Sequence, residues 1–292
     1  MEISAVNALL CPHCGSEFST PDTNATSLAC TSGHSFDIAR QRYLNLLTGH
    51  GTKFVPDTAA MVSARDSFLD AGHYAPLAQA LAETVKELVP GAGMIVDAGT
   101  GTGYYLQQVL AGYAENQESG LARSVTAVGM DISKFALRRA SRRNPAALNI
   151  VWDLWRELPL GASTADVVLV VFAPRNASEF ARILKPGGTL IVVTPLASHL
   201  AEIAQEAGLL GIQEDKEAAL NHSLEEHFTP SGSRELLVPL HLGPADIGNV
   251  ALMGPAGHHL DTVELGERLA HLPEETLATA AFRISTFTAR HP

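Results

Sequence analysis

Three cysteines and a histidine near the amino terminus form two closely spaced pairs. Cys11 and Cys14 make a C-x2-C pair, and Cys30 and His34 make a C-x3-H pair one short loop later. Zinc favours four tetrahedral sulfur and nitrogen ligands, which two such pairs supply. Because the protein fills all four positions, we predict a closed structural site. His13 is a poorer candidate than His34 because it lies inside the first pair, too close to both cysteines.

The rest of the sequence contains no cysteine, and an odd total of three argues against a disulfide framework. The alternative interpretation is three free cysteines and an unrelated histidine. A segment this short cannot bury enough apolar surface to fold alone, whereas structural zinc contributes about 10–16 kcal/mol to peptides of this kind. We therefore predict that residues 1–48 form a zinc-binding module.

A glycine-rich turn is the second group that could bind a ligand. An apolar segment ends in Asp97, and Gly99, Gly101 and Gly103 follow before a predicted helix at residues 104–113. Glycines let the backbone approach a ligand closely, and the start of a helix presents free N–H groups. Dinucleotide-binding folds share this pattern, so the glycines alone do not identify the ligand.

Three carboxylates favour S-adenosylmethionine as the ligand. Asp97 suits the cationic methionine end, and Asp131 ends the next apolar segment, where it could accept the ribose hydroxyls. Asp153 follows the segment 149–152, where the adenine edge would lie. The alternative is that Asp97 and Asp131 only cap helices. Their joint placement at the ends of consecutive predicted strands favours cofactor binding.

Strands must end along one edge to bring these side chains together. Predicted strands occupy residues 93–97, 124–130, 149–152, 165–172 and 189–194. A polar surface insertion is predicted at 115–122 and a KPGG turn at 185–188. Two later segments, 234–242 and 279–288, are predicted to be closing strands. Alternating strands and helices predict an α/β fold with a doubly wound parallel sheet. The order of the three aspartates and the KPGG turn resembles Rossmann-like class I S-adenosylmethionine-dependent methyltransferases.

Two predicted helices connect the zinc module to this sheet. The first spans residues 57–72, with Asp57 or Thr58 as its N-cap, and the second spans residues 76–88. We accordingly predict a helical connector at 49–90 and a methyltransferase domain at 91–292. The helices could cover the ligand site.

The composition describes a well-cored globular chain, with 46% hydrophobic and 17% charged residues. No apolar run is long enough to cross a bilayer and no signal peptide is evident, so we expect a cytoplasmic protein. The net charge of −11 repels polyanions overall. Binding to nucleic acid would therefore require a local basic surface.

Several stretches resemble one family, the RlmA-type 23S rRNA (guanine-N1)-methyltransferases. The matching stretches are the four zinc-ligand positions, FDIARQRYLNLL at 36–47, DAGHYAPL at 70–77, DAGTGTGYY at 97–105, FAPRN at 172–176 and TPLASHL at 194–200. The last two look most similar to the actinobacterial tylosin-resistance branch. Together they span most of the chain from residue 11 to about 200, and the carboxyl-terminal third adds little.

The resemblance implies methylation of N1 of one guanine in a domain II hairpin of 23S rRNA, beside the macrolide-binding exit tunnel. It also implies a homodimer whose zinc modules help form the RNA cleft. By motif matching, Tyr74, Gly101, Thr102 and His199 would join the cofactor shell. The alternatives are methylation of a small molecule or protein, with the zinc module as a lid or dimer element, and a catalytically silent binding module.

The acceptor side is less defined, and we identify no general base. A guanine lifted out of its pair needs a stacking surface, for which Phe172, Trp152 and Trp155 are candidates, although each could equally be a core residue. Candidate RNA-contacting cations occupy a predicted helix at 134–143, which carries five of them, and the flank of the zinc-ligand cluster at Arg40, Arg42 and Lys53. A charge-rich helix can also be a solvated face.

Overall fold

The computed structural model describes residues 3–22, 25–49, 52–114, 125–209 and 216–290. The predicted insertion at 115–122 lies outside these ranges. The helices are α1 (Ile3–Asn7), α2 (Ala59–Asp70), α3 (Ala75–Leu88), α4 (Tyr104–Ala114), α5 (Lys134–Arg143), α6 (Ala177–Ile183), η2 (Ala201–Ile203), α7 (Lys216–Leu224), α8 (Pro244–Met253), η3 (Pro255–His258) and α9 (Thr262–Leu269). The strands are β1 (Ser27–Ala29), β2 (Ser35–Asp37), β3 (Leu44–Asn45), β4 (Gly93–Ala98), β5 (Val125–Asp131), β6 (Leu148–Val151), β7 (Ala165–Val171), β8 (Leu184–Pro195), β9 (Phe228–Leu242) and β10 (Thr276–Ala289).

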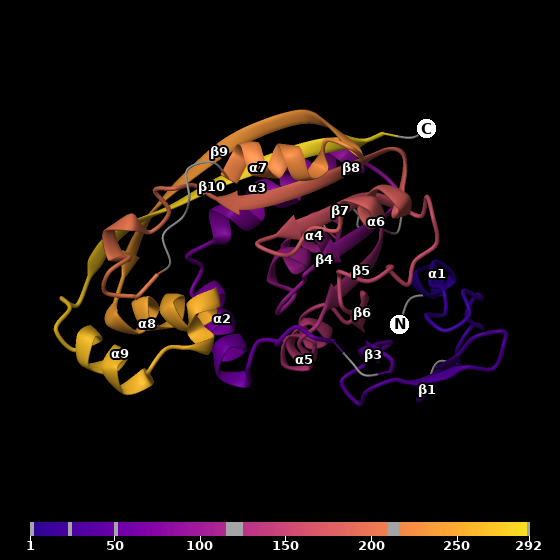
Figure 1. Cartoon of the computed structure of the whole chain (residues 1–292), viewed down its shortest axis with the longest axis horizontal. Coiled ribbons are helices and arrows are strands. Elements are labelled where there is room, and N and C mark those ends of the chain that lie inside the picture. Colours follow the sequence, from indigo (N-terminus) through magenta and orange to yellow (C-terminus); the bar gives the residue numbers. More distant parts are fainter. Residues whose placement is uncertain (1–2, 23–24, 50–51, 115–124, 210–215, 291–292) are drawn as a thin grey trace.

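One mixed sheet forms the centre of the molecule, in the order β3-β6-β5-β4-β7-β8-β10-β9 (Figure 1). Neighbouring strands from β3 to β8 run parallel, and β10 is antiparallel to both β8 and β9. The predicted pairing of β4 with β5 is confirmed, with Asp97 beside Gly129. The carboxyl ends of β4, β5, β6 and β7 consequently meet at one edge.

The sheet separates two apolar cores. On one face, Ile95, Val167 and Ile191 pack with α3 and α4. On the other face, Val96 and Val168 pack with α6, with α7 and with the amino-terminal segment. The central strands are thus buried on both sides, as parallel strands require, which explains their nearly continuous apolar sequences.

The amino-terminal segment shares its core with the sheet. Leu9, Phe18, Leu28 and Phe36 belong to the same buried cluster as Val96 of β4. In addition, β3 pairs with β6 at the edge of the sheet. The boundaries predicted at residues 48 and 90 stay predictions, and apolar side chains on both sides of residue 48 pack together.

The connector helices begin and end where local signals place them. The Thr58 hydroxyl accepts a hydrogen bond from the Met61 amide, which makes Thr58 the N-cap of α2. Beyond the carboxyl end of α2, Gly72 has φ of +86°. The α2 helix packs against α5 and α8. Along the long axis of the molecule, α8 and α9 lie at one end and β1 at the other (Figure 1).

One predicted boundary is wrong. The KPGG segment was expected to be a turn before the fifth strand, but β8 already begins at Leu184. The partner residues on β7 shift in register between Ala165 and Val167, so residues 185–188 form an irregularity within the strand. Gly187 allows it because its φ is +79°. No helix in the described ranges is long and apolar enough to cross a membrane.

Candidate active site and zinc cluster

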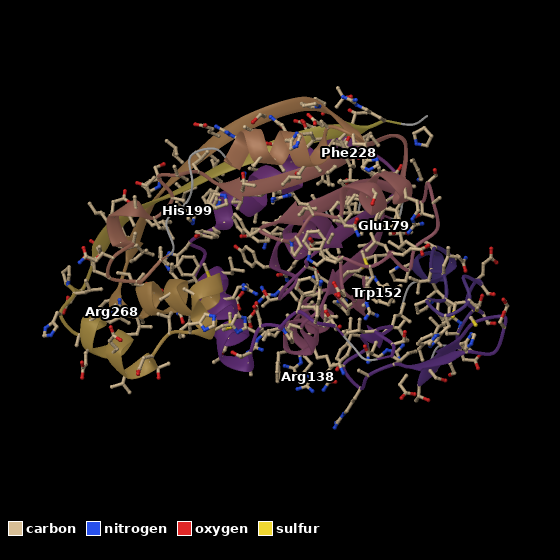
Figure 2. The ribbon with its side chains drawn as sticks, in the orientation of Figure 1. Arg138, Trp152, Glu179, His199, Phe228 and Arg268 are labelled. Carbon is tan, nitrogen blue, oxygen red and sulfur yellow. The ribbon has the colours of Figure 1, made fainter. Side chains whose placement is uncertain are left out.

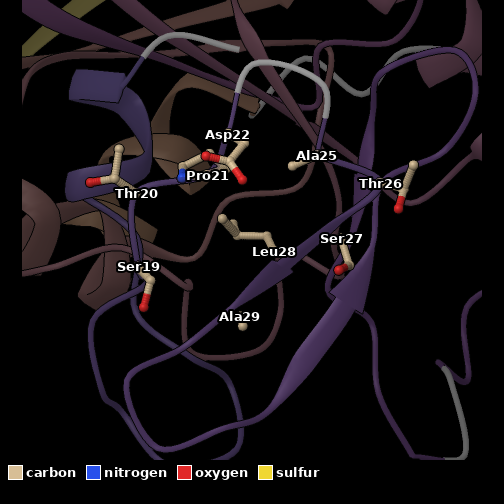
Figure 3. Close-up of a pocket in the computed structure, with 9 residues that line it drawn as sticks. All are labelled: Ser19, Thr20, Pro21, Asp22, Ala25, Thr26, Ser27, Leu28 and Ala29. Atoms are coloured by element: carbon tan, nitrogen blue, oxygen red, sulfur yellow. The ribbon is translucent and has the colours of Figure 1, made fainter.

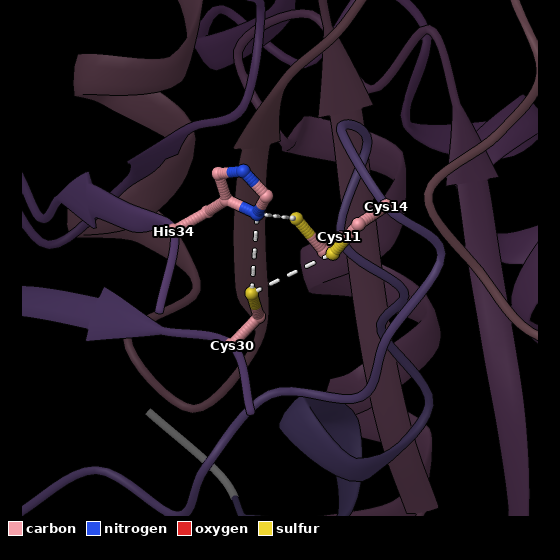
Figure 4. Close-up of side chains that lie close together, drawn as sticks. All are labelled: Cys11, Cys14, Cys30 and His34. Carbon is pink, nitrogen blue, oxygen red and sulfur yellow. Dashed lines mark hydrogen bonds between the residues drawn. The ribbon is translucent and has the colours of Figure 1, made fainter. Parts of the chain in front are cut away.

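The four predicted zinc ligands lie together (Figure 4). Cys14 Sγ and Cys30 Sγ are 3.8 Å apart, and His34 Nδ1 lies 3.6 Å from Cys30 Sγ and 3.7 Å from Cys11 Sγ. A tetrahedral zinc ion with ordinary sulfur and nitrogen bond lengths holds its ligand atoms about 3.5–3.8 Å apart. These three distances therefore match those of a zinc site, and all four ligand atoms lie within 4.8 Å of one another.

Local backbone structure prepares this cluster. The Gly15 amide donates to the Cys11 carbonyl and the Gly33 amide donates to the Cys30 carbonyl. Both glycines have positive φ, 69° and 90°, so each ligand pair turns through a conformation that suits glycine. Hydrogen bonding with Ser16 lowers the pKa of Cys14 to about 5, which favours the thiolate that binds metal.

His13 lies outside the ligand group. Its ring stacks on Phe36 at 5.8 Å and lies 5.0 Å from the ring of His34. An open hollow of about 480 Å³ lies elsewhere on the module, lined by Ser19–Asp22 and Ala25–Ala29 (Figure 3). Asp22 is the one charged residue among its described lining residues. The hollow therefore offers no cation for a phosphate.

The glycine-rich turn follows β4 as predicted. Gly99, Gly101 and Gly103 all have positive φ, between 55° and 90°. A Cβ atom at Gly99 would lie 2.2 Å from the Ala173 side chain, and one at Gly103 would lie 2.6 Å from Asn144 Nδ2. These two glycines thus permit close packing, while a Cβ atom at Gly101 would approach only Arg65 Cδ, at 4.0 Å.

Asp97 is buried without a full set of partners. Its side chain is 1% exposed, and Asp97 Oδ2, Thr100 Oγ1 and Thr102 Oγ1 find no hydrogen-bond partner within the described part of the chain. Burial, and to a lesser extent the charge of Asp131, raises the pKa of Asp97 to about 7. Such groups favour a ligand that brings hydrogen-bond donors and positive charge, which the ammonium of S-adenosylmethionine supplies.

Asp131 ends β5 next to this turn. Its carboxylate accepts hydrogen bonds from the Gly101 amide at 2.9 Å and the Ser133 amide at 2.7 Å. Burial raises the pKa of Asp131, which these amides and the charge of Arg65 oppose. The structure places Asp97 and Asp131 at the ends of adjacent strands, and the predicted contact of Asp131 with the ribose stays a prediction.

Asp153 has local partners already. One oxygen accepts from the Thr52 hydroxyl at 2.7 Å, and the other accepts from the Trp155 amide at 3.0 Å. The carboxylate thereby links the connector to the loop after β6. Each oxygen has a second lone pair, so the predicted contact with adenine requires no rupture of these bonds.

Tyr74 and His199 meet although they are far apart in sequence. The Tyr74 hydroxyl lies 3.1 Å from His199 Nε2, and the other imidazole nitrogen lies 3.1 Å from the Ala281 amide. Burial raises the pKa of Tyr74 above its ordinary value, so its hydroxyl stays neutral. The Phe282 ring packs on both residues, which connects α3 and the segment after β8 to β10. Their predicted place in the cofactor shell stays a prediction.

The three candidate stacking residues differ in exposure. Trp152 is 3% exposed and belongs to the core, whereas Trp155 is 52% and Phe172 45% exposed. Phe172 has φ of +54°, an uncommon conformation for an aromatic residue. It directly follows β7, and the next residue, Ala173, packs on Gly99. Phe172 thus remains a candidate platform beside the glycine turn, and Trp152 does not.

The cations of α5 divide into two groups. Arg139 and Arg143 form ion pairs with Asp66 of α2, and Arg143 also pairs with Asp70. The remaining three cations, Lys134, Arg138 and Arg142, are exposed. They follow one another at i, i+4 and i+8, and Arg138 lies at the molecular surface (Figure 2).

Sequence reasoning missed Arg65. This α2 residue pairs with Asp57, donates to the Met253 carbonyl at 2.8 Å, and lies beside the open side of Gly101. It therefore ties the connector to α8 next to the glycine turn. No spacing in the sequence could reveal it, because its partner on α8 lies far along the chain.

Known proteins support this description of both regions. Residues 9–50 match the family model for the amino-terminal zinc ribbon of RlmA, and residues 96–192 match a methyltransferase domain. A "23S rRNA (guanine(748)-N(1))-methyltransferase" of Streptomyces fradiae is 43% identical over 100% of this chain and 99% of its own length. The chain belongs to the 23S rRNA (guanine-N1)-methyltransferase family. Two further relatives are named provisionally as such enzymes: one from Micromonospora griseorubida (42% identical, 96% of each chain) and YxjB of Bacillus subtilis (32%, covering 79% of this chain and 78% of the relative).

Family membership confirms the predicted enzyme class, its S-adenosylmethionine dependence and its structural zinc. The predicted fold is also confirmed. In this methyltransferase, Asp97 and the glycine turn fit the methyl donor because their unpartnered polar atoms and open backbone are concentrated there. The individual assignments of ligand residues remain predictions.

Proposed function

We propose that this chain transfers a methyl group from S-adenosyl-L-methionine to N1 of one guanine in a domain II hairpin of 23S rRNA. The observation that carries the proposal is the full-length identity of 43% to a guanine-N1 methyltransferase. The exposed ring of Phe172, which directly precedes the Ala173 that packs on Gly99, supports it, because an extruded base needs a stacking surface next to the methyl donor.

The protein's part in the reaction is mainly placement. When bound, the donor supplies a methyl carbon on a positively charged sulfur. The guanine N1 would give its proton to solvent, since no base is assigned, and its electron pair would take up the methyl group as the donor leaves as a neutral thioether. Asp97 would hold the methionine end, Asp131 the ribose, and Asp153 the adenine edge. Alignment of N1 with the methyl carbon supplies much of the rate.

The remaining assignments of the cofactor shell belong to this proposal. The backbone and side chains of the turn would line the donor through Gly99, Gly101, Thr102 and Gly103. Tyr74 and His199, joined by their hydrogen bond, would close the shell from α3 and the segment after β8. No catalytic base is assigned.

We place the RNA on the surface that carries exposed cations and aromatic rings. The exposed α5 residues are Lys134, Arg138 and Arg142. On the connector, Lys53 lies over the ring of Phe54, which faces Trp155 with their centroids 6.3 Å apart. Cations bind phosphates and exposed rings stack on unpaired bases. This surface would overcome the repulsion expected from the net charge of −11.

The zinc module at 1–48, with Cys11, Cys14, Cys30 and His34 as ligands, would form part of the same RNA surface. We further propose the connector at 49–90, the catalytic domain at 91–292, a homodimer, a cytoplasmic location with the ribosomes, and a contribution to macrolide resistance of the tylosin type. Sedimentation of the purified protein at several concentrations tests the dimer. A single monomeric species at all concentrations would contradict it.

Transfer of labelled methyl groups tests the function. The purified enzyme is incubated with labelled S-adenosylmethionine and either 23S rRNA, a domain II hairpin or the same hairpin with adenosine at each guanine in turn. We expect label in RNA, 1-methylguanosine after digestion, and loss of label from one substituted hairpin. Absence of label from all guanine-containing RNAs would overturn the proposal, as would a different methylated nucleoside.

A further inference from the structure

Arg175 is a half-buried cation without a partner. It makes no hydrogen bond or ion pair with any residue that the structure describes. The other half-buried arginines in the described ranges all have acceptors, namely Arg65, Arg139, Arg143, Arg156, Arg182, Arg268 and Arg283. Partial burial lowers the pKa of Arg175, so removing this guanidinium from water carries a cost that no described residue offsets.

The backbone on both sides of Arg175 is fixed. Two residues before it, Ala173 packs on the Gly99 position, where an added Cβ would lie 2.2 Å away. The next residue, Asn176, donates its side-chain amide to the Leu154 carbonyl at 2.9 Å. Three residues before it stands the exposed ring of Phe172. The unpaired guanidinium therefore belongs to a rigid loop at the edge where methyl donor and acceptor must meet.

We propose that Arg175 binds the O6 and N7 atoms of the acceptor guanine while its base stacks on Phe172. This inference rests on the proposed function and names a residue that determines the choice of base. The guanidinium fork has two parallel N–H donors, and guanine presents O6 and N7 as two neighbouring acceptors. The contact leaves N1 free on the adjoining edge of the base, where it can face the methyl carbon.

The same contact would affect both specificity and reactivity. Adenine carries an amino group at the position of O6, so a donor of Arg175 would face a donor and adenine would be rejected. When guanine N1 loses its proton, the negative charge is shared with O6. A guanidinium at O6 stabilises this anion and makes N1 a better nucleophile at neutral pH. The arrangement therefore lowers the need for a strong base near N1.

A double-mutant cycle between enzyme and RNA tests the contact. Wild-type enzyme and the Arg175→Gln variant are each measured on the hairpin with guanosine or 7-deazaguanosine at the target position. We expect wild-type kcat/KM to fall about 10-fold when N7 is removed, within the usual range for a base contact. The variant should lose about 100-fold on guanosine and, on 7-deazaguanosine, should change further only by the effect of the analogue on N1 acidity. Any effect of the analogue on N1 acidity acts on both enzymes equally.

A phosphate is the other acceptor that would suit this guanidinium. In that case the losses from the variant and from 7-deazaguanosine would be independent and would multiply, which overturns the proposal.

The pH profile gives a second readout in single-turnover reactions. We expect the rate of Arg175→Gln to keep rising to higher pH than that of wild type, because N1 deprotonates less readily. Superimposable profiles would contradict the stabilisation of the anion.

Folding and function are checked separately. Arg175→Gln should retain its zinc content and its affinity for S-adenosylmethionine, since the residue has no described partner to lose, and Arg175→Lys provides a second variant that keeps the charge. If wild-type enzyme forms 1-methylguanosine and the variants match it on every RNA, the inference about Arg175 fails alone. If the wild type forms none, the proposed function itself fails.

Discussion

The zinc cluster and the methyl-donor site are built in opposite ways. The cluster takes its four ligand atoms from two short loops, and these atoms lie within 4.8 Å of one another. The proposed donor site would take its residues from β4, β5, the loop after β6, the start of α3 and the segment after β8. Polar atoms in the cluster face each other, while at Asp97, Thr100 and Thr102 they are left unpartnered within the described residues.

This difference shows where each site gains its stability. A closed metal site stabilises the fold of its own module, so its ligands should be sensitive to any change. An open cofactor site is held by the surrounding sheet and keeps unsatisfied groups for its ligand, which costs stability in the free protein. Substitutions in the first region should therefore damage structure, and substitutions in the second should damage binding.

Cys14→Ser should have the largest effect. It removes one zinc ligand, and the loss of bound zinc forfeits much of the roughly 10 kcal/mol that such a site contributes to its module. We expect less than one zinc per two chains by elemental analysis, loss of RNA methylation, and affinity for S-adenosylmethionine within a few-fold of wild type. The matched control is His13→Ala, which should keep one zinc per chain because His13 lies outside the ligand group. Normal RNA methylation by Cys14→Ser would contradict the proposed role of the module.

Asp97→Ala should instead damage cofactor binding and leave zinc binding intact. Loss of the buried carboxylate should weaken S-adenosylmethionine binding at least 100-fold by calorimetric titration, about 3 kcal/mol, while zinc content stays unchanged. Asp261→Asn is the control: Asp261 caps α9 through its side chain, and asparagine caps equally well. Cofactor affinity of Asp97→Ala near that of wild type would show that the donor binds elsewhere.

The pH dependence of the unfolding free energy should show that the buried carboxyl of Asp97 destabilises the free protein. The pKa of Asp97 is raised from 3.8 to about 7, so the folded protein holds this proton more tightly than the unfolded chain. Its contribution to stability is present below pH 4 and is lost as the pH rises to about 7. Asp97→Asn, which stays neutral, should be more stable than wild type at pH 8 by up to about 4 kcal/mol.

That advantage should disappear near pH 4. Urea unfolding at pH 4 and pH 8 measures the free energy of unfolding of Asp97→Asn and of wild type. An equal difference between the two proteins at both pH values would show that burial does not destabilise the ionised carboxyl. Donor affinity provides a companion measurement. Because the ammonium favours the ionised form of Asp97, wild-type affinity should rise between pH 5 and 7, whereas that of Asp97→Asn should stay flat.

Local features of the two sites could be predicted from the sequence, whereas features that depend on distant segments could not. Cys11, Cys14, Cys30 and His34 were recognisable because their spacing is local and the chemistry of zinc restricts it. The strand ends at Asp97 and Asp131 were recognisable for a similar reason, since each carboxylate directly follows an apolar run. Boundaries were less predictable: β8 begins at Leu184 and includes the KPGG segment, because its pairing with β7 tolerates a register shift there.

Long-range partners lay beyond the sequence. Nothing in the order of residues pairs Arg65 with the Met253 carbonyl or Thr52 with Asp153. The sequence does not distinguish the five cations of α5 from one another. Arg139 and Arg143 form ion pairs because α2 packs beside α5 and provides Asp66. Trp152 and Trp155 likewise differ only in burial, which depends on tertiary packing.

The adjacent pair Arg138 and Arg139 provides the smallest and most closely matched test. Arg138 is exposed and contacts only the ring of Phe135 among described residues, whereas Arg139 pairs with Asp66 at 2.9 Å. Arg138→Gln should weaken RNA binding about 3- to 10-fold, lower the slope of log affinity against log salt by about one, and leave the unfolding free energy unchanged. Arg139→Gln should cost about 1 kcal/mol of stability, because it breaks the link between α5 and α2, and should leave the salt slope unchanged.

Titrations of labelled hairpin at several salt concentrations, together with urea unfolding, distinguish the two outcomes. Equal salt slopes for both variants would remove α5 from the RNA surface and leave the connector and the zinc module to bind the phosphates.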